Sequence, residues 1–111
     1  MLVTPKEIEV FRVKNGGVPF EDWWDDLNDK KAVARVLARL ARVRQDNLGD
    51  CKSVGEGVSE LRVDYGPGHR VYFEQKGQTL VVLLCGGDQR TQDRDIRLAK
   101  QYWHEFKVSE L

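Results

Sequence analysis

The most constraining feature of this sequence is an uninterrupted apolar run, TLVVLLC, over residues 79–85. Turn-forming residues bound it on both sides, Lys76-Gly77 before it and the GGD segment 86–88 after it. A strand with one face in water alternates apolar and polar residues, whereas a short continuous apolar run suits a strand that is buried on both faces. We therefore expect residues 79–85 to form a central strand of a sheet.

The remaining elements follow from periodicity and turn residues. The predicted elements are, in chain order, a strand (5–13), a short helix (20–27), a longer helix from a cap at Asn28 or Asp29 to about residue 46, three strands (58–65, 69–75 and 79–85) and a last helix that is capped by Thr91. The segment from 47 to 57 is expected to be a loop. With 111 residues the chain has room for one domain. The order β-α-α-β-β-β-α predicts a single α+β domain over residues 1–111, with a small, mainly antiparallel sheet.

Charge is balanced overall but unevenly distributed. The chain has 18 Lys and Arg and 18 Asp and Glu, which argues against a uniformly basic nucleic-acid coat. Residues 1–29 contain three basic and seven acidic side chains, whereas residues 30–46 contain six basic side chains and only Asp46 as an acid. Within the predicted helix, Lys31, Arg35, Arg39 and Arg42 share the face opposite an apolar stripe (Val33, Val36, Leu37, Leu40 and Val43). This basic face could be merely solvated or could meet an anionic partner.

Several classes of protein are disfavoured. No apolar run is long enough for a membrane span, and residues 1–13 are too charged for a signal peptide. Cys51 and Cys85 stand 34 positions apart, which favours reduced thiols and a cytoplasmic location over a disulfide. With only two histidines and two scattered cysteines, we expect no metal site and no cofactor.

The predicted hairpin over residues 58–75 carries the most suggestive polar residues. A three-residue loop at Gly66-Pro67-Gly68 would pair Arg62 with Tyr72 and Asp64 with Arg70, and would place all four side chains on the face opposite the core. Two arginines and a tyrosine on a rigid sheet can clamp a phosphate and contact a base. An ordinary Asp64–Arg70 ion pair, with Glu60 diluting the positive field, explains the same pattern. A two-residue loop would instead separate these groups onto opposite faces.

Three motifs in a fixed order resemble a known family. They are LGDCKSVGEGVSELR (48–62), YGPGHRVYF (65–73) and LLCGGDQRTQ (83–92). The chain is similar to the RelE/ParE superfamily of toxins over most of its length, and more closely to the HigB-like, phage-type "addiction module killer protein" branch. The layout of the family, β-α-α-β-β-β-α, agrees with the elements predicted above.

The resemblance implies the toxin of a type II toxin–antitoxin pair. Such toxins are typically ribosome-dependent endoribonucleases that cut mRNA in the ribosomal A site without a metal ion, which implies contact with ribosomal RNA. The chemistry is attack of a ribose 2′-OH on the adjacent phosphate. The implied protein partner is a HigA-like helix-turn-helix antitoxin, in a hetero-oligomeric complex.

The resemblance also implies roles for individual residues. Arg70 matches the arginine of the G-P-G-x-R motif and is the candidate phosphate clamp, supported by Arg62. Lys52 would hold phosphate or accept a proton. The remaining candidates are His69 and Asp95 for acid–base chemistry, and Gln89, Arg90, Gln92, Tyr72, Arg35 and Arg39 for RNA contacts. His69 stands where the branch usually has a tyrosine, and Gln89 where relatives usually have a lysine, so the general acid is not identified.

Two other functions fit the same motifs. The superfamily fold also supports ParE-like inhibition of DNA gyrase without nuclease chemistry, because a fold does not fix a function. The departures at His69 and Gln89 are also compatible with a degenerate, non-toxic member that only binds its antitoxin.

Overall fold

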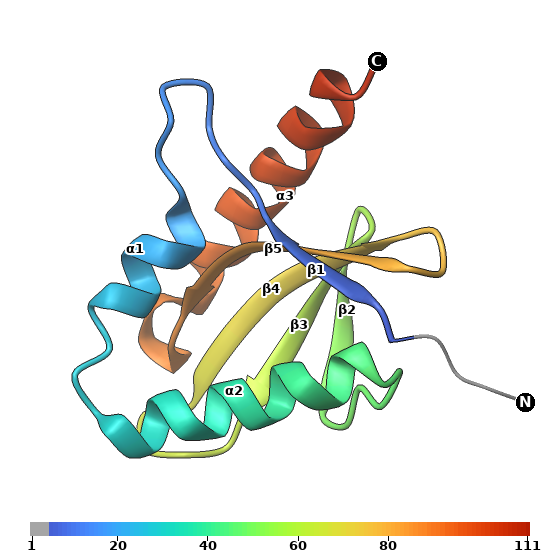
Figure 1. Ribbon diagram of the computed structural model, residues 1–111. Helices are drawn as coiled ribbons and strands as arrows, with labels where there is room; N and C mark the ends of the chain where they lie inside the picture. Colours follow the sequence, from blue (N-terminus) through green and yellow to red (C-terminus); the bar gives the residue numbers. More distant parts are fainter. Residues whose placement is uncertain (1–4) are drawn as a thin grey trace, which may run out of the picture.

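The computed structural model describes residues 5–111 and shows an α+β protein built on one five-stranded sheet (Figure 1). Its elements are β1 (Glu7–Val10), α1 (Pro19–Asp25), α2 (Lys30–Arg44), β2 (Cys51–Gly55), β3 (Val58–Val63), β4 (His69–Lys76), β5 (Leu80–Gly87), the 3₁₀ turn η1 (Gln89–Thr91) and α3 (Gln92–Ser109). The strands lie in the order β1-β5-β4-β3-β2. Only the β1–β5 pair is parallel, so the sheet is mixed but mainly antiparallel, as predicted. Of the predicted domain over residues 1–111, residues 1–4 lie outside the described part.

Helices cover both faces of the sheet. On one face, α1 and α2 pack over a core that includes Phe20, Val36 and Phe73. On the other face, α3 packs over a second core that includes Tyr72, Leu84 and Trp103 (Figure 1). The α3 face is the one that matters for the candidate site, because it carries the polar side chains of β3 and β4.

The central strand is confirmed. β5 hydrogen-bonds to β1 on one side and to β4 on the other, and residues 81–85 are all buried. Side chains on alternate positions enter the two different cores, Val81 and Leu83 on the α2 side and Val82 and Leu84 on the α3 side. A strand sandwiched in this way has no polar face, which explains the continuous apolar run.

The long helix α2 begins where the sequence predicted. The Asp29 carboxylate accepts hydrogen bonds from the backbone N–H of Lys31 (2.9 Å) and Ala32 (3.4 Å), which completes the first turn. Of the predicted apolar stripe, Val36, Leu40 and Val43 are buried, Val33 is half-buried, and Leu37 is 53% exposed. Ala32 takes its place in the core, because the buried stripe is centred on Val36 and Leu40 and Leu37 lies one step around the helix.

The predicted loop over residues 47–57 is wrong in part, because residues 51–55 form the edge strand β2. Its exposed residues Lys52 and Ser53 show no apolar alternation, so the segment lacked the usual signal of a strand. β2 pairs with β3 through Cys51–Leu61 and Lys52–Glu60, and a turn at Glu56 and Gly57, both with positive φ, joins the two strands.

The hairpin register also differs from the prediction. β3 and β4 are joined by a five-residue loop, 64–68, and the pairs are Val63–His69, Arg62–Arg70 and Glu60–Tyr72. Relative to the expected three-residue loop, the pairing is shifted by two residues. Because side chains alternate with a period of two, this shift leaves every residue on its predicted face. Asp64 falls in the loop, so the expected Asp64–Arg70 cross-strand pair does not form, and Arg62 faces Arg70 instead.

Between residues 5 and 111, no helix combines the length and the apolar character needed to cross a bilayer. Within the same residues, no three His, Cys, Asp or Glu side chains gather closely enough to hold a metal ion.

The packing of α1 on the sheet requires a glycine at position 86. A Cβ at Gly86 would lie 2.3 Å from the indole ring of Trp23. We expect Gly86→Ala to lower the free energy of unfolding by about 1–3 kcal/mol through overpacking. Urea titration followed by tryptophan fluorescence measures the change. In the matched control Gly17→Ala, the new Cβ meets only the side chains of Val13 and Asn15 at 3.2 and 3.5 Å, so the loss is smaller. Equal stability of the two variants would contradict the contact between Trp23 and Gly86.

Candidate nucleic-acid interface

A buried carboxylate organises the α3 face of the hairpin. Glu60 on β3 is fully buried, yet its side chain has four polar partners. Oε1 accepts a hydrogen bond from Arg62 Nε at 2.9 Å, and Oε2 accepts one each from the Tyr72 hydroxyl and Gln92 Nε2, both at 2.9 Å. Arg70 Nε lies 3.5 Å from Oε2, an ion-pair distance without hydrogen-bond geometry. The cluster joins β3, β4 and the start of α3.

Glu60 is held in its charged form. Burial acts to raise the pKa of Glu60, but the hydrogen bonds from Arg62, Gln92 and Tyr72 and the charge of Arg70 outweigh it, and the pKa lies below its ordinary value. Burial and the hydrogen bond to Glu60 raise the pKa of Tyr72, so its hydroxyl stays protonated and acts as a donor. Two guanidinium groups therefore share one negative charge, and the cluster keeps a net positive charge.

Arg62 and Arg70 lie side by side on the same face of the sheet. They are directly paired across β3 and β4, and their side chains are 35% and 12% exposed. Arg70 Nη1 donates to the carbonyl of Gly68 at 3.2 Å, which fixes the guanidinium next to the 64–68 loop. Within the described residues, both terminal nitrogens of Arg62 and Nη2 of Arg70 make no hydrogen bond. These nitrogens can donate to an anion.

Other predicted residues surround this pair. Lys52 on β2 is exposed and is paired with Glu60, so it lies on the same face. The Gln89 backbone N–H donates to the Pro67 carbonyl at 3.4 Å, which brings η1 against the loop that precedes Arg70. Gln92 is committed to Glu60. The arginines, the lysine and the two glutamines thus lie in one region, contributed by β2, β3, β4 and the start of α3.

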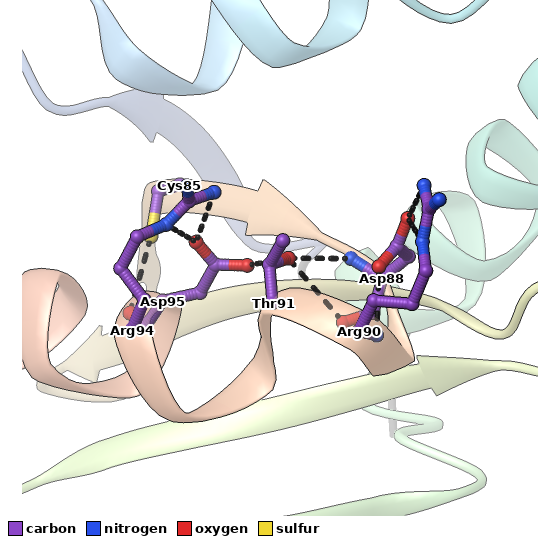
Figure 2. A network of polar contacts seen from close by, with 6 residues as sticks. All are labelled: Cys85, Asp88, Arg90, Thr91, Arg94 and Asp95. Atoms are coloured by element: carbon purple, nitrogen blue, oxygen red, sulfur yellow. Dashed lines mark hydrogen bonds and ion pairs between the residues drawn. The ribbon is translucent and has the colours of Figure 1, made fainter.

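The turn before α3 is held by a polar network (Figure 2). Asp88 accepts hydrogen bonds from the backbone and the guanidinium of Arg90, and its own N–H donates to Thr91 Oγ1 at 3.3 Å. The Thr91 hydroxyl donates to Asp95, so Thr91 stands at the predicted cap position of α3 without capping the helix through its side chain, and Asp88 caps the preceding turn η1. The Arg90 side chain is 83% exposed and is therefore accessible to a ligand.

Asp95 is a buried member of this network. The residue is 3% exposed, and its carboxylate faces Thr91 and Arg94 (Figure 2). A Cβ at Gly87 would lie 1.8 Å from Asp95 Oδ2, so the carboxylate fills the space above that glycine. Gly87 is paired with Arg70 across β4 and β5. Asp95 is thus near the arginine pair but is enclosed by protein.

The structure does not bring His69 and Tyr72 to the surface of this region. The side chain of His69 points to the opposite face of the sheet, where it is 9% exposed and its ring lies 6.3 Å from that of Trp23. Val63 is the cross-strand neighbour of His69. Tyr72 is on the correct face but is fully buried, which corrects the expectation that it touches RNA directly.

The two predicted arginines of α2 have different environments. Arg39 donates to the backbone carbonyls of Arg62, Leu48 (2.8 Å) and Asp50 (3.3 Å), so its guanidinium ties α2 to β3 and to the loop that precedes β2. Arg35 is exposed and lies over the ring of Tyr65, 4.9 Å from its centroid. Neither shares a face with the arginine pair.

Sequence reasoning missed the role of Glu60, which it treated as a charge that weakens the site. The alternation of side chains along the two strands places Glu60, Arg62, Arg70 and Tyr72 on one face. This alternation was the one sequence signal that could have grouped Glu60 with the arginines. The burial of Glu60 comes from α3, whose residue Gln92 completes the cluster from 32 positions away. That contact is tertiary and has no local signature.

Comparison with known proteins gives one clear relationship. No family model matches the chain. A Haemophilus influenzae protein described as "Uncharacterized protein" is 48% identical over 81 residues, which cover 73% of this chain and 82% of that protein. The chain belongs to the same family as this protein. At this identity the two members of the family are expected to share their fold.

The charge of Glu60 predicts a pH dependence of stability. Because folding lowers its pKa from the ordinary 4.5, the stability that the carboxylate contributes is present above pH 4.5 and is lost as the pH falls through the folded-state value. Glu60→Gln removes this titration, so we expect lower stability at pH 7 and a flatter decline on acidification than in the wild type. Urea unfolding between pH 3 and 7 measures both effects.

The difference between the pH dependence of the wild type and that of Glu60→Gln reports the titration of Glu60 alone. The hydrogen bond from Tyr65 lowers the pKa of Asp29 and that from Arg90 lowers the pKa of Asp88, but both groups titrate alike in the two proteins. Glu21→Gln, at an exposed position of α1, serves as the matched control and should follow the wild-type curve. Parallel curves for Glu60→Gln and the wild type would show that the carboxylate is not ionised in the fold.

The contacts of Arg39 predict a structural role. Arg39→Ala removes three hydrogen bonds to backbone carbonyls, of which that of Asp50 keeps a second donor, the N–H of Arg62, and we expect a loss of about 1–3 kcal/mol in the free energy of unfolding. Arg39→Lys should recover only part of it, because one ammonium cannot reproduce a planar fork. Urea titration measures the loss, with Arg42→Ala, exposed on the same helix, as the control. If Arg39→Ala and Arg42→Ala have the same stability, the three contacts contribute nothing.

Proposed function

We propose that this chain is the toxin of a type II toxin–antitoxin system of the RelE/ParE superfamily, HigB-like branch, and that it cuts mRNA on the ribosome. The observation that carries the proposal is the direct pairing of Arg62 with Arg70 on one face of the sheet, with free guanidinium nitrogens and Lys52 on the neighbouring strand. Fixed cations that converge on one point are what a phosphoryl transfer needs, because its transition state gains negative charge on the phosphate oxygens.

The proposed reaction needs only the RNA and groups of the protein. The ribose 2′-oxygen attacks the adjacent phosphorus and loses its proton, the bond from phosphorus to the 5′-oxygen breaks, and that oxygen takes up a proton. The products are a 2′,3′-cyclic phosphate and a 5′-hydroxyl. Arg70 and Arg62 stabilise the charge on the non-bridging oxygens. Lys52 binds the phosphate or takes part in the proton transfer.

Other predicted residues position the arginine pair or contact the RNA outside the reacting phosphate. Tyr72, Gln92 and Glu60 fix the two guanidinium groups, so they act as positioning residues. Asp95 acts through Thr91 and the turn that contains Gln89, and the exposed Arg90 contacts the RNA strand or ribosomal RNA. In a cell, we propose, a helix-turn-helix antitoxin encoded nearby neutralises the toxin in a hetero-oligomeric complex.

Induction in bacterial cells tests the proposal. Wild-type protein should arrest growth and produce new mRNA 5′ ends in primer extension. Arg70→Ala should reduce cleavage by at least about 100-fold, as expected for loss of a group that stabilises transition-state charge. Arg70→Lys should restore little, since a lysine cannot supply two parallel donors.

The Arg70→Ala variant is expected to remain folded. In Arg70→Ala, Glu60 keeps its hydrogen bonds to Arg62, Tyr72 and Gln92, so thermal unfolding should still be cooperative. Arg42→Ala on α2 should be as toxic as the wild type. Toxicity and cleavage that persist in a folded Arg70→Ala variant would contradict the assignment of this site.

A second candidate function rests on a specific observation. His69 and Asp95, the two acid–base candidates of the sequence, are both buried, which leaves the general acid unassigned. That favours a toxin that binds without cutting, such as a ParE-like inhibitor of DNA gyrase, or a member that only binds its antitoxin. Gyrase supercoiling assays with purified protein distinguish these. Inhibition without mRNA cleavage supports the gyrase function, and harmless overexpression with intact antitoxin binding supports the non-toxic member.

A further inference from the structure

A second basic surface lies along α3, on the same side of the sheet as the arginine pair. The surface is a shallow groove of about 660 Å³ between α3 and the turn that joins β2 to β3. Its lining residues are Glu56, Arg97, Lys100, Gln101, His104 and Lys107. We refer to Arg97, Lys100 and Lys107 as the α3 cationic strip. These residues lie along one flank of the helix, because positions three, four and seven apart share a side.

The strip adjoins the exposed side of the hairpin. Lys100 Nζ would lie 3.3 Å from a Cβ at Gly55, so its ammonium group sits beside the end of β2. Eight residues earlier on the same helix, Gln92 donates to Glu60 on β3. At 1.5 Å per residue, α3 therefore runs for about 12 Å alongside the hairpin face that carries Lys52 and Arg62. The arginine pair and the strip therefore lie on the same side of the sheet, with α3 running from one to the other.

The strip has little internal compensation. Within the described residues, neither Arg97 nor Lys100 forms an ion pair. Lys107 lies over the ring of Trp103, 5.7 Å from its centroid, and its charge lowers the pKa of Glu74, though less than burial raises it. The acids nearby are Glu56 in the groove, Asp93 at the start of the helix and the half-buried Glu74. Together with Lys52 and Arg62, the three cations of the strip outnumber these acids.

We propose that the α3 cationic strip binds the phosphates of a single-stranded RNA that continues from the linkage held by Arg62 and Arg70. The inference rests on the proposed function and adds to it a second contact region for the same strand. The separation along α3 places the strip beyond one nucleotide, so it binds the flanking part of the strand rather than the reacting phosphate. Flexible lysines suit this task, because backbone contacts set affinity and position without reading sequence.

Binding of a fluorescently labelled, single-stranded oligouridine to the full chain tests the inference, with anisotropy measured at several salt concentrations. For Arg97→Ala/Lys100→Ala, the slope of log affinity against log salt should fall by about 1.4, that is 0.7 for each lost phosphate contact. The charge-matched control Lys31→Ala/Arg42→Ala, exposed on α2, should bind as the wild type does. Thermal unfolding confirms that both double variants are folded.

The outcomes separate this inference from the proposed function. If Arg70→Ala removes cleavage in cells while Arg97→Ala/Lys100→Ala binds oligouridine with wild-type affinity and slope, the strip is wrong and the toxin site stands. If the double variant loses RNA affinity but Arg70→Ala does not change cleavage, the strip stands and the toxin site is wrong. A labelled glutamate-rich peptide of the same charge is the competing ligand. Weaker peptide binding with unchanged RNA binding in the double variant would overturn the inference in favour of a protein partner.

Discussion

The buried charge of Glu60 is the constraint on which the α3 side of the molecule depends. A carboxylate removed from water costs several kcal/mol unless charges and donors surround it. Here four side chains from three elements provide that environment, three of them through hydrogen bonds and Arg70 through its charge. The same arrangement fixes the two guanidinium groups against each other. Like charges at adjacent positions of a sheet repel, and the shared anion makes their pairing stable.

The different coverings of the two sheet faces explain where the polar cluster lies. On the α1 and α2 side, the buried side chains form an apolar core from Phe20 to Leu83. On the other side, α3 alone packs over β3, β4 and β5, and the exposed part of β2 and β3 is left beside it. Glu60 is buried at the margin of α3, whereas Arg62 and Lys52 lie further out. Because exposure increases from Glu60 to Arg62 and Lys52, the carboxylate stays buried while the cations beside it reach solvent.

Much of this fold was predictable because its signals are local. The apolar run at 79–85, the Asp29 cap and the alternation in β3 and β4 each depend on residues close in sequence. The edge strand β2 was not predictable from periodicity, since an exposed edge gains its stability from hydrogen bonds to β3 rather than from buried side chains. The hairpin loop was predicted two residues too short. Because side chains alternate with a period of two, this shift still assigned each strand residue to the correct face of the sheet. Of the site, alternation predicted which residues share a face, whereas burial by α3 and the contact of His69 with Trp23 required tertiary structure.

The neutral total charge and a site for an anion are compatible because the charges are separated in space. Acidic residues are concentrated before residue 30, whereas the α3 side of the sheet carries the arginine pair, Lys52 and the α3 cationic strip. Glu60 reduces the positive charge at the arginine pair but not at the strip. The α3 cationic strip would attract an RNA strand by long-range electrostatics. The fixed guanidinium groups of Arg62 and Arg70 would bind one phosphate of that strand by directed hydrogen bonds. Orientation at the reacting phosphate and affinity for the strand would then come from different residues, so either could change with little effect on the other.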